Sequence, residues 1–75
     1  MYYLIEITTK ENDTEKAIYQ YETRDEAIAM FHQKLGGAMK NADYLAEMLM
    51  VIDDCGAIQI YDYWQRPIES EEVEA

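Results

Sequence analysis

The sequence predicts an α+β fold with the order β-β-α-β-β, in which one helix packs on one face of a four-stranded antiparallel sheet. Three observations support this prediction. A capped amphipathic segment lies near the middle of the chain, two alternating segments precede it, and two apolar segments joined by a short turn follow it. Because the members of each extended pair are close in sequence, each pair should form an antiparallel hairpin.

The central segment, residues 23–37, begins with the signals of a helix N-terminus. Thr23 and Glu26 form a T-x-x-E capping box, in which the threonine hydroxyl accepts a backbone N–H of the first turn. Asp25 and Glu26 also lie where the helix dipole favours negative charge. These residues predict that the helix starts directly after Thr23.

One side of this helix is apolar and should face the core. At helical spacing four residues form the stripe: Ala27, Ile28, Phe31 and Leu35. Met30 falls on the opposite side. The pair Gly36-Gly37 predicts the end of the helix, because glycine is the common left-handed stop. If the helix instead runs through the glycines, Met39 would extend the stripe.

The first hairpin is expected from two alternating runs, residues 1–9 and 16–22, around the polar turn 10–14. In the first run the alternation separates two sets of side chains: Tyr3, Ile5 and Ile7 against Tyr2, Leu4, Glu6 and Thr8. In the second run it separates Ala17, Tyr19 and Tyr21 from Lys16, Ile18, Gln20 and Glu22.

The second hairpin depends on an ambiguous segment, residues 44–52. Its Leu, Ala, Glu and Met residues favour a helix. However, the turn residues 53–56 and the β-favouring run 57–65 follow directly, and a run, a tight turn and a second run are typical of a hairpin. We therefore favour a strand for residues 44–52. Pro67 should end the last strand, because proline cannot donate to the ladder.

Composition indicates one folded domain, residues 1–68, and a disordered acidic tail, residues 69–75. The net charge is −10. Direct nucleic-acid binding is therefore disfavoured, because it needs Lys and Arg to displace counterions. With one cysteine, no apolar run of bilayer length and no basic leader, we expect a cytoplasmic protein that does not insert into a membrane.

No residue pattern predicts catalysis, a cofactor or a metal site. His32, the single histidine, has neither an orienting partner nor a nucleophile marked in the sequence. Cys55 lies beside Asp53 and Asp54, and neighbouring carboxylates disfavour a reactive thiolate. The two aspartates are turn formers without the further ligands of a calcium loop. We therefore expect no catalytic, cofactor-binding or metal-binding residues.

The seven tyrosines are the most informative residues for function, because almost all of them lie in predicted strands. One helix covers only one face of a sheet, so the other face would carry apolar side chains. Exposed aromatic faces mark protein interfaces. The expected interface is formed by five residues: Tyr2, Leu4, Ile18, Tyr61 and Tyr63. A homodimer or a host protein is the expected partner.

The segments MYYLIEIT, FHQKLGGAMKN, MVIDDCGA and YWQRP resemble a group of very short proteins from phages and integrated mobile elements of Firmicutes. The resemblance covers residues 1 to about 68. It implies a cytoplasmic accessory protein and no catalytic residues. Small acidic proteins of this origin sometimes inhibit host defence nucleases by occupying a nucleic-acid site.

The sequence therefore supports three classes of function in order. The first is a non-enzymatic protein-binding module, dimeric through its aromatic sheet face. The alternative is an acidic, anti-CRISPR-like inhibitor of a nucleic-acid-binding host protein. The third, an enzyme, is a distant alternative.

Overall fold

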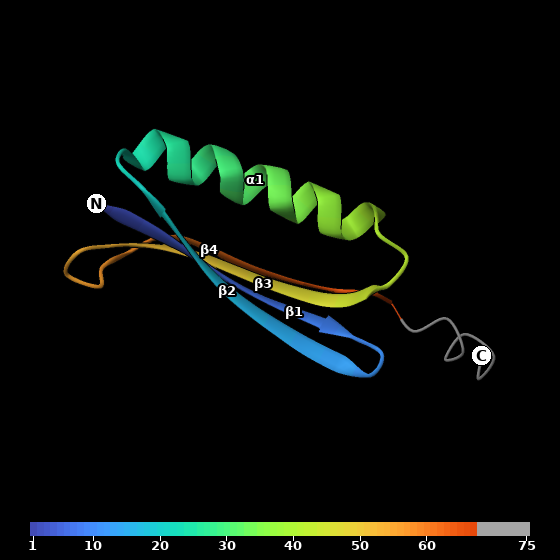
Figure 1. Ribbon diagram of the computed structural model, residues 1–75. Helices are drawn as coiled ribbons and strands as arrows, with labels where there is room; N and C mark the ends of the chain where they lie inside the picture. The colour runs from blue at the N-terminus through green and yellow to red at the C-terminus, as the bar shows by residue number, and fades with distance from the viewer. Residues whose placement is uncertain (68–75) are drawn as a thin grey trace.

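The computed structural model describes residues 1–67, which form four strands and one helix in the predicted order (Figure 1). The elements are β1 (Tyr2–Lys10), β2 (Asp13–Tyr21), α1 (Arg24–Lys40), β3 (Tyr44–Asp53) and β4 (Ile58–Gln65). The α+β fold is therefore confirmed. The predicted disordered tail, residues 69–75, lies outside the described part of the chain.

The strands form one antiparallel sheet in the order β2-β1-β3-β4. The two hairpins thus lie side by side, with β1 and β3 in the centre and β2 and β4 at the edges. The helix runs along one face of this sheet (Figure 1). Among residues 1–67, no other element covers the opposite face. The molecule is therefore a two-layer structure with one open sheet face.

The start of α1 agrees with the sequence, but its end does not. The Thr23 hydroxyl accepts the backbone N–H of Glu26 at 3.2 Å, as the capping box predicts. The predicted stop at Gly36-Gly37 is wrong, because the helix continues to Lys40 and is capped by Asn41. Ala38 in the extra turn is buried against the sheet. This packing offsets the cost of glycine in a helix, which is about 1 kcal/mol per residue.

The buried stripe of α1 is rotated from the predicted one. Its buried members are Ala27, Phe31, Leu35 and Ala38. Ile28 is only partly buried, and Met39, the predicted extension, is exposed. The prediction that Met30 points away is also wrong, because this side chain is partly buried and packs against the core cluster. The buried stripe thus continues from Leu35 to Ala38 and not to Met39.

The register of the first hairpin is set by a two-residue turn. Lys10 pairs with Asp13, so only Glu11 and Asn12 form the connection, which is shorter than the expected turn. This register places Leu4 opposite Tyr19 and Ile5 opposite Ile18. A shift of one residue would move every side chain of a strand to the other face.

The second hairpin confirms the strand interpretation of residues 44–52. Oδ1 of Asp53 accepts the backbone N–H groups of Cys55 and Ala57, both at 2.9 Å. Gly56 has a φ of 87°, which is the left-handed region that glycine adopts without strain. The turn chemistry thus folds β3 back onto β4, although the residues of β3 favour a helix.

The core lies between α1 and the central strands. Leu4 of β1 packs with Leu49 and Val51 of β3 and with Phe31 of α1, and all four are almost completely buried. Tyr2, Tyr19 and Tyr21 pack around this cluster with part of each ring in contact. Two polar side chains, those of Thr8 and Glu47, are also buried here.

Candidate functional site

The face of the sheet that α1 does not cover is a continuous apolar surface, which we call the uncovered face. Its side chains come from all four strands in cross-strand register. For example, Ile18, Ile5, Met50 and Tyr61 form one row across the sheet. Ten apolar residues form this face: Tyr3, Ile5, Ile7, Ile18, Met48, Met50, Ile52, Ile58, Tyr61 and Tyr63.

The apolar side chains at the margins of this face are exposed to an unusual degree. Ile18 on one edge strand has 69% of its surface accessible, and Tyr61 on the other has 55%. Lys16 is the one charged residue among the described positions in register on this face, and no carboxylate lies there. In a chain of net charge −10, acids are thus excluded from one whole face of the sheet.

A shallow depression of about 430 Å³ lies on this face between β1 and β2. It is lined by Ile5, Ile7, Ala17, Ile18 and the side chain of Lys16. Since most of these residues are aliphatic, the depression suits an apolar side chain from another molecule.

Three of the five predicted interface residues lie on the uncovered face: Ile18, Tyr61 and Tyr63. The placement of Tyr2 and Leu4 there is wrong. Leu4 is completely buried under α1, and Tyr2 packs against the same core. The two-residue turn sets Leu4 beside Tyr19 and Ile5 beside Ile18, so Leu4 and Ile18 lie on opposite faces, and α1 covers the face of Leu4.

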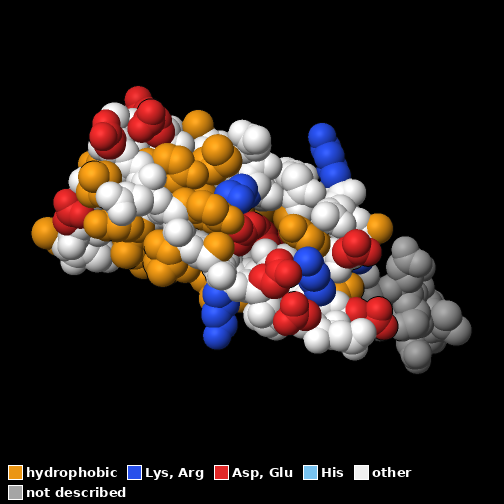
Figure 2. All heavy atoms as spheres, in the orientation of Figure 1, with side chains coloured by type: hydrophobic (Ala, Val, Ile, Leu, Met, Phe, Trp, Pro, Cys, Tyr) orange, Lys and Arg blue, Asp and Glu red, His pale blue; other side chains and the backbone are white. Residues whose placement is uncertain are grey.

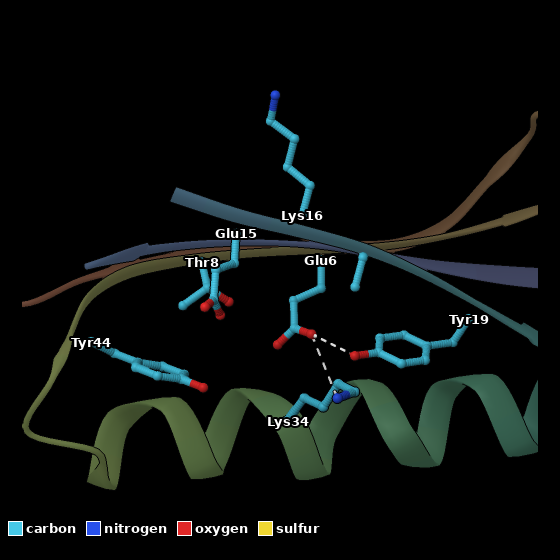
Figure 3. Close-up of a pocket in the computed structure, with 8 residues that line it drawn as sticks. Glu6, Thr8, Glu15, Lys16, Tyr19, Lys34 and Tyr44 are labelled. Carbon is cyan, nitrogen blue, oxygen red and sulfur yellow. Dashed lines mark hydrogen bonds and ion pairs between the residues drawn. The ribbon is translucent and has the colours of Figure 1, made fainter. Parts of the chain in front are cut away.

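A second feature, on the helix side of the sheet, is a polar groove of about 480 Å³ between β1, β2 and the second half of α1. Figure 3 shows Glu6, Tyr19 and Lys34 converging in this groove, whereas Lys16 points away. Glu6 Oε1 accepts a hydrogen bond from the Tyr19 hydroxyl at 3.3 Å and lies 3.5 Å from Lys34 Nζ. The Lys34 ammonium also lies 4.3 Å from the centre of the Tyr19 ring.

These contacts shift the pKa values of the two ionisable partners, Glu6 and Lys34. Burial acts to lower the pKa of Lys34, but the nearby Glu6 carboxylate outweighs burial and raises it above its ordinary value. Burial alone would raise the pKa of Glu6. The neighbouring Glu47 side chain and the charge of Lys34 reverse the effect and lower that pKa. The groove therefore holds an ion pair that joins α1 to β1.

Sequence reasoning missed Glu47, which is the most deeply buried ionisable group of this region. One signal was visible, since Glu47 is the single charged residue in the apolar run of residues 44–52. Successive side chains of a strand point to opposite faces of the sheet. The position of Glu47 in the run therefore shows which residues share its face, but not whether that face is buried.

The kinds of side chain on the surface also change along the length of the molecule. Figure 2 shows a band of hydrophobic side chains over the half that holds the N-terminus, and a mixture of acidic and basic side chains toward the β1–β2 turn. At that turn, Glu11 and Asp13 share a second depression, of about 620 Å³, with Asp43 from the loop after α1.

The surroundings of His32 and Asp53, two residues considered in the sequence analysis, are explained by the fold. His32 is exposed, and its ring lies edge-on to Phe31 with the centroids 5.2 Å apart. Asp53 is occupied by the hydrogen bonds of its turn. Across residues 1–67, no three side chains of His, Cys, Asp or Glu are arranged to hold a metal ion. Within the same range, no helix has the length and apolar character needed to cross a membrane.

No protein-family model, curated protein or solved structure matches this chain. The fold itself defines the class of the molecule, a small α+β domain in which one helix covers one face of an open four-stranded sheet.

Proposed function

We propose that this protein is a non-enzymatic protein-binding module that acts through the uncovered face, and that a second copy of the chain covers this face in a homodimer. The observation that supports the proposal most strongly is the separation of charge. Ten apolar side chains lie on a face where Lys16 is the one charged residue and no acid is found among the described positions, in a chain with sixteen acidic residues.

The size of the face is suitable for a stable interface. The strands are 8 to 10 residues long. With strands about 4.8 Å apart and a rise of about 3.3 Å per residue, the face measures roughly 20 by 30 Å. Exposed apolar patches larger than a few hundred Å² mark interaction sites. A standard interface buries about 800 Å² of accessible surface per partner.

Charge favours a second copy as the occupant. Two molecules of net charge −10 repel one another at long range. Contact through the uncovered faces would bring no carboxylates together, and it would leave Lys16 beside the depression at one margin. A two-fold axis would pair two identical apolar faces and exclude water from both.

Measuring the mass in solution tests this proposal. Sedimentation equilibrium of the full chain at micromolar concentration should give twice the 8.8 kDa mass of one chain. Tyr61→Glu, which places a charge on an exposed position of the face, should give a monomer. Gln33→Glu, which adds the same charge to the exposed side of α1, should remain a dimer.

Two results would overturn the proposal. One is a wild-type protein that is monomeric at every concentration. The other is a Tyr61→Glu variant that dimerises as tightly as Gln33→Glu, with circular dichroism showing that both are folded.

The second candidate is an acidic inhibitor of a nucleic-acid-binding protein, in the cytoplasm of a host that carries the phage or mobile element. Its supporting observation is the group Glu11, Asp13 and Asp43 around one depression. A double variant, Glu11→Gln with Asp43→Asn, decides between the two. If a nucleic-acid-binding protein is retained from host lysate by the wild type and lost by this variant, while Tyr61→Glu still retains it, the inhibitor is the better explanation.

A further inference from the structure

Glu47 is buried without a full set of hydrogen-bond partners. It lies on β3 between Thr8 of β1 and Trp64 of β4, and none of its surface is accessible. The Thr8 hydroxyl donates to Oε1 of Glu47 at 2.5 Å. Oε2 of the same carboxyl has no hydrogen-bond partner among the described residues.

An ionised carboxylate in this position would be strongly disfavoured. Removing such a charge from water costs several kcal/mol unless a cation and hydrogen bonds compensate it. The cation of this region, Lys34, pairs with Glu6, to which its Nζ lies at 3.5 Å. Glu47 has no ion pair of its own among residues 1–67. A protonated carboxyl removes the charge and turns one of its oxygens into a donor.

Glu6 is a suitable acceptor for that proton. Its side chain is 12% exposed, and it is held by Tyr19 and Lys34 at one of its oxygens, Oε1. Glu6 and Thr8 are neighbours on the face of β1 that α1 covers, with Ile7 between them in sequence. Thr8 is the residue that donates to Glu47. A carboxylic acid that donates to a neighbouring carboxylate satisfies both groups and places one negative charge opposite Lys34.

We propose that Glu6 and Glu47 form a proton-binding site beneath α1, in which Glu47 stays protonated at neutral pH and donates its Oε2–H to the Glu6 carboxylate. The pair then carries a single negative charge, which the Lys34 ammonium neutralises. When the proton is lost, two carboxylates face one ammonium, and the attachment of α1 to the sheet weakens.

The surroundings of the site agree with this assignment. Burial is the first cause that raises the pKa of Glu47, and the neighbouring Glu6 carboxylate is the second; together they raise it to about 8. The groups that face the pair are Thr8 on β1, Tyr19 on β2, Lys34 on α1 and the uncharged Trp64 on β4. Glu15 and Tyr44 also line the groove. Glu15 is paired with Lys10 at 3.2 Å, and the same ammonium lies 5.6 Å from the centre of the Tyr44 ring.

The effect on stability has a defined sign. Because the pKa of Glu47 is raised on folding, the stability that its proton contributes is complete below the ordinary value of 4.5 and is lost as the pH rises to about 8. The pKa of Glu6 is lowered, so its contribution is present above its ordinary value and is lost on acidification. Stability should therefore decline from mildly acidic to mildly alkaline pH.

Carbon-13 NMR of the full chain, labelled at the glutamate carboxyls, tests the protonation directly. The Glu47 resonance should titrate with a midpoint near pH 8, well above the ordinary glutamate value of 4.5. A Glu47 carboxyl that titrates at the ordinary value would overturn the proposal. This measurement uses the wild type, so it is decisive even if a variant fails to fold.

A pair of matched variants tests the consequence. Between pH 5.5 and 8.5 the wild-type Tm should fall, by on the order of 10 °C for a domain of this size. Glu47→Gln keeps an acceptor for Thr8 and a donor for Glu6, so its Tm should vary much less over this range. Glu15→Gln should behave as the wild type. If Glu47→Gln shows the wild-type pH dependence at equal protein concentration, the site does not bind the proton.

Discussion

Arg66 donates from its Nε to the backbone carbonyl of Tyr44 at 2.9 Å, which ties the end of β4 to the beginning of β3. Its terminal nitrogen also donates to the carbonyl of Asn41 at 2.7 Å, and its guanidinium lies over Trp64. The Arg66 side chain thus holds the loop after α1 against the last strand. From the sequence, this position was expected only to end that strand.

We expect Arg66→Ala to lower the free energy of unfolding by about 1–2 kcal/mol, because the change removes charge-assisted hydrogen bonds to two carbonyl groups. Arg24→Ala is the control, since Arg24 is exposed and donates to one side chain, that of Gln59. Chemical denaturation at fixed protein concentration measures both. Equal losses from the two variants would contradict the role of Arg66 as a tie between elements.

The helix phase can be tested in the core. Phe31→Ala should cost about 3–5 kcal/mol, the usual loss for removing a buried phenylalanine. Met30→Ala should cost about 1 kcal/mol, because Met30 is only partly buried at the margin of the cluster. If Phe31→Ala does not fold, Phe31→Leu provides the comparison. A loss at Met30 as large as that at Phe31 would show that the helix is rotated from the position described.

Gly37, one of the two glycines within α1, gives a prediction of opposite sign. A Cβ added at Gly37 meets no atom within 4 Å, so Gly37→Ala should stabilise the protein by about 0.5–1 kcal/mol through helix propensity. Gly56→Ala is the control and should destabilise, because Gly56 has a φ of 87°. Thermal unfolding of both variants checks the pair. A destabilising Gly37→Ala would indicate that another molecule packs closely on this side of α1.

Salt should not weaken the proposed dimer. Repulsion between two acidic chains is screened within about 8 Å at physiological ionic strength, whereas burial of the uncovered face does not depend on charge. Sedimentation at low and high salt should therefore show an association that is unchanged or tighter at high salt. Dissociation on adding salt would mean that charge complementarity holds the chains together.

The features that the sequence predicted correctly are local ones. The Thr23 cap requires one hydroxyl near one backbone N–H, and the turn after Asp53 requires one aspartate and one glycine. The order of the elements follows from such signals. The stop at Gly36-Gly37 was wrong because the burial of Ala38, a tertiary contact, outweighs the local preference of glycine.

The candidate interface was predicted in part for a related reason. Both faces of β1 are apolar, with Tyr2 and Leu4 on one and Tyr3 and Ile5 on the other. Alternation separates the two sets but cannot show which one a helix will cover. The two-residue turn fixed which side chains share a face, Leu4 with Tyr19 and Ile5 with Ile18, and the packing of α1 on the first of these faces placed Leu4 in the core.

By itself, therefore, the sequence determined the elements, their order and the turns that reverse the chain, because these depend on residues within a few positions of one another. The tertiary structure alone decided the strand order, the face that α1 covers and the burial of Glu47 beside Glu6. Residues 6 and 47 are brought together only when β3 pairs with β1, and the charge that such a pair can carry depends on the helix that excludes water from it.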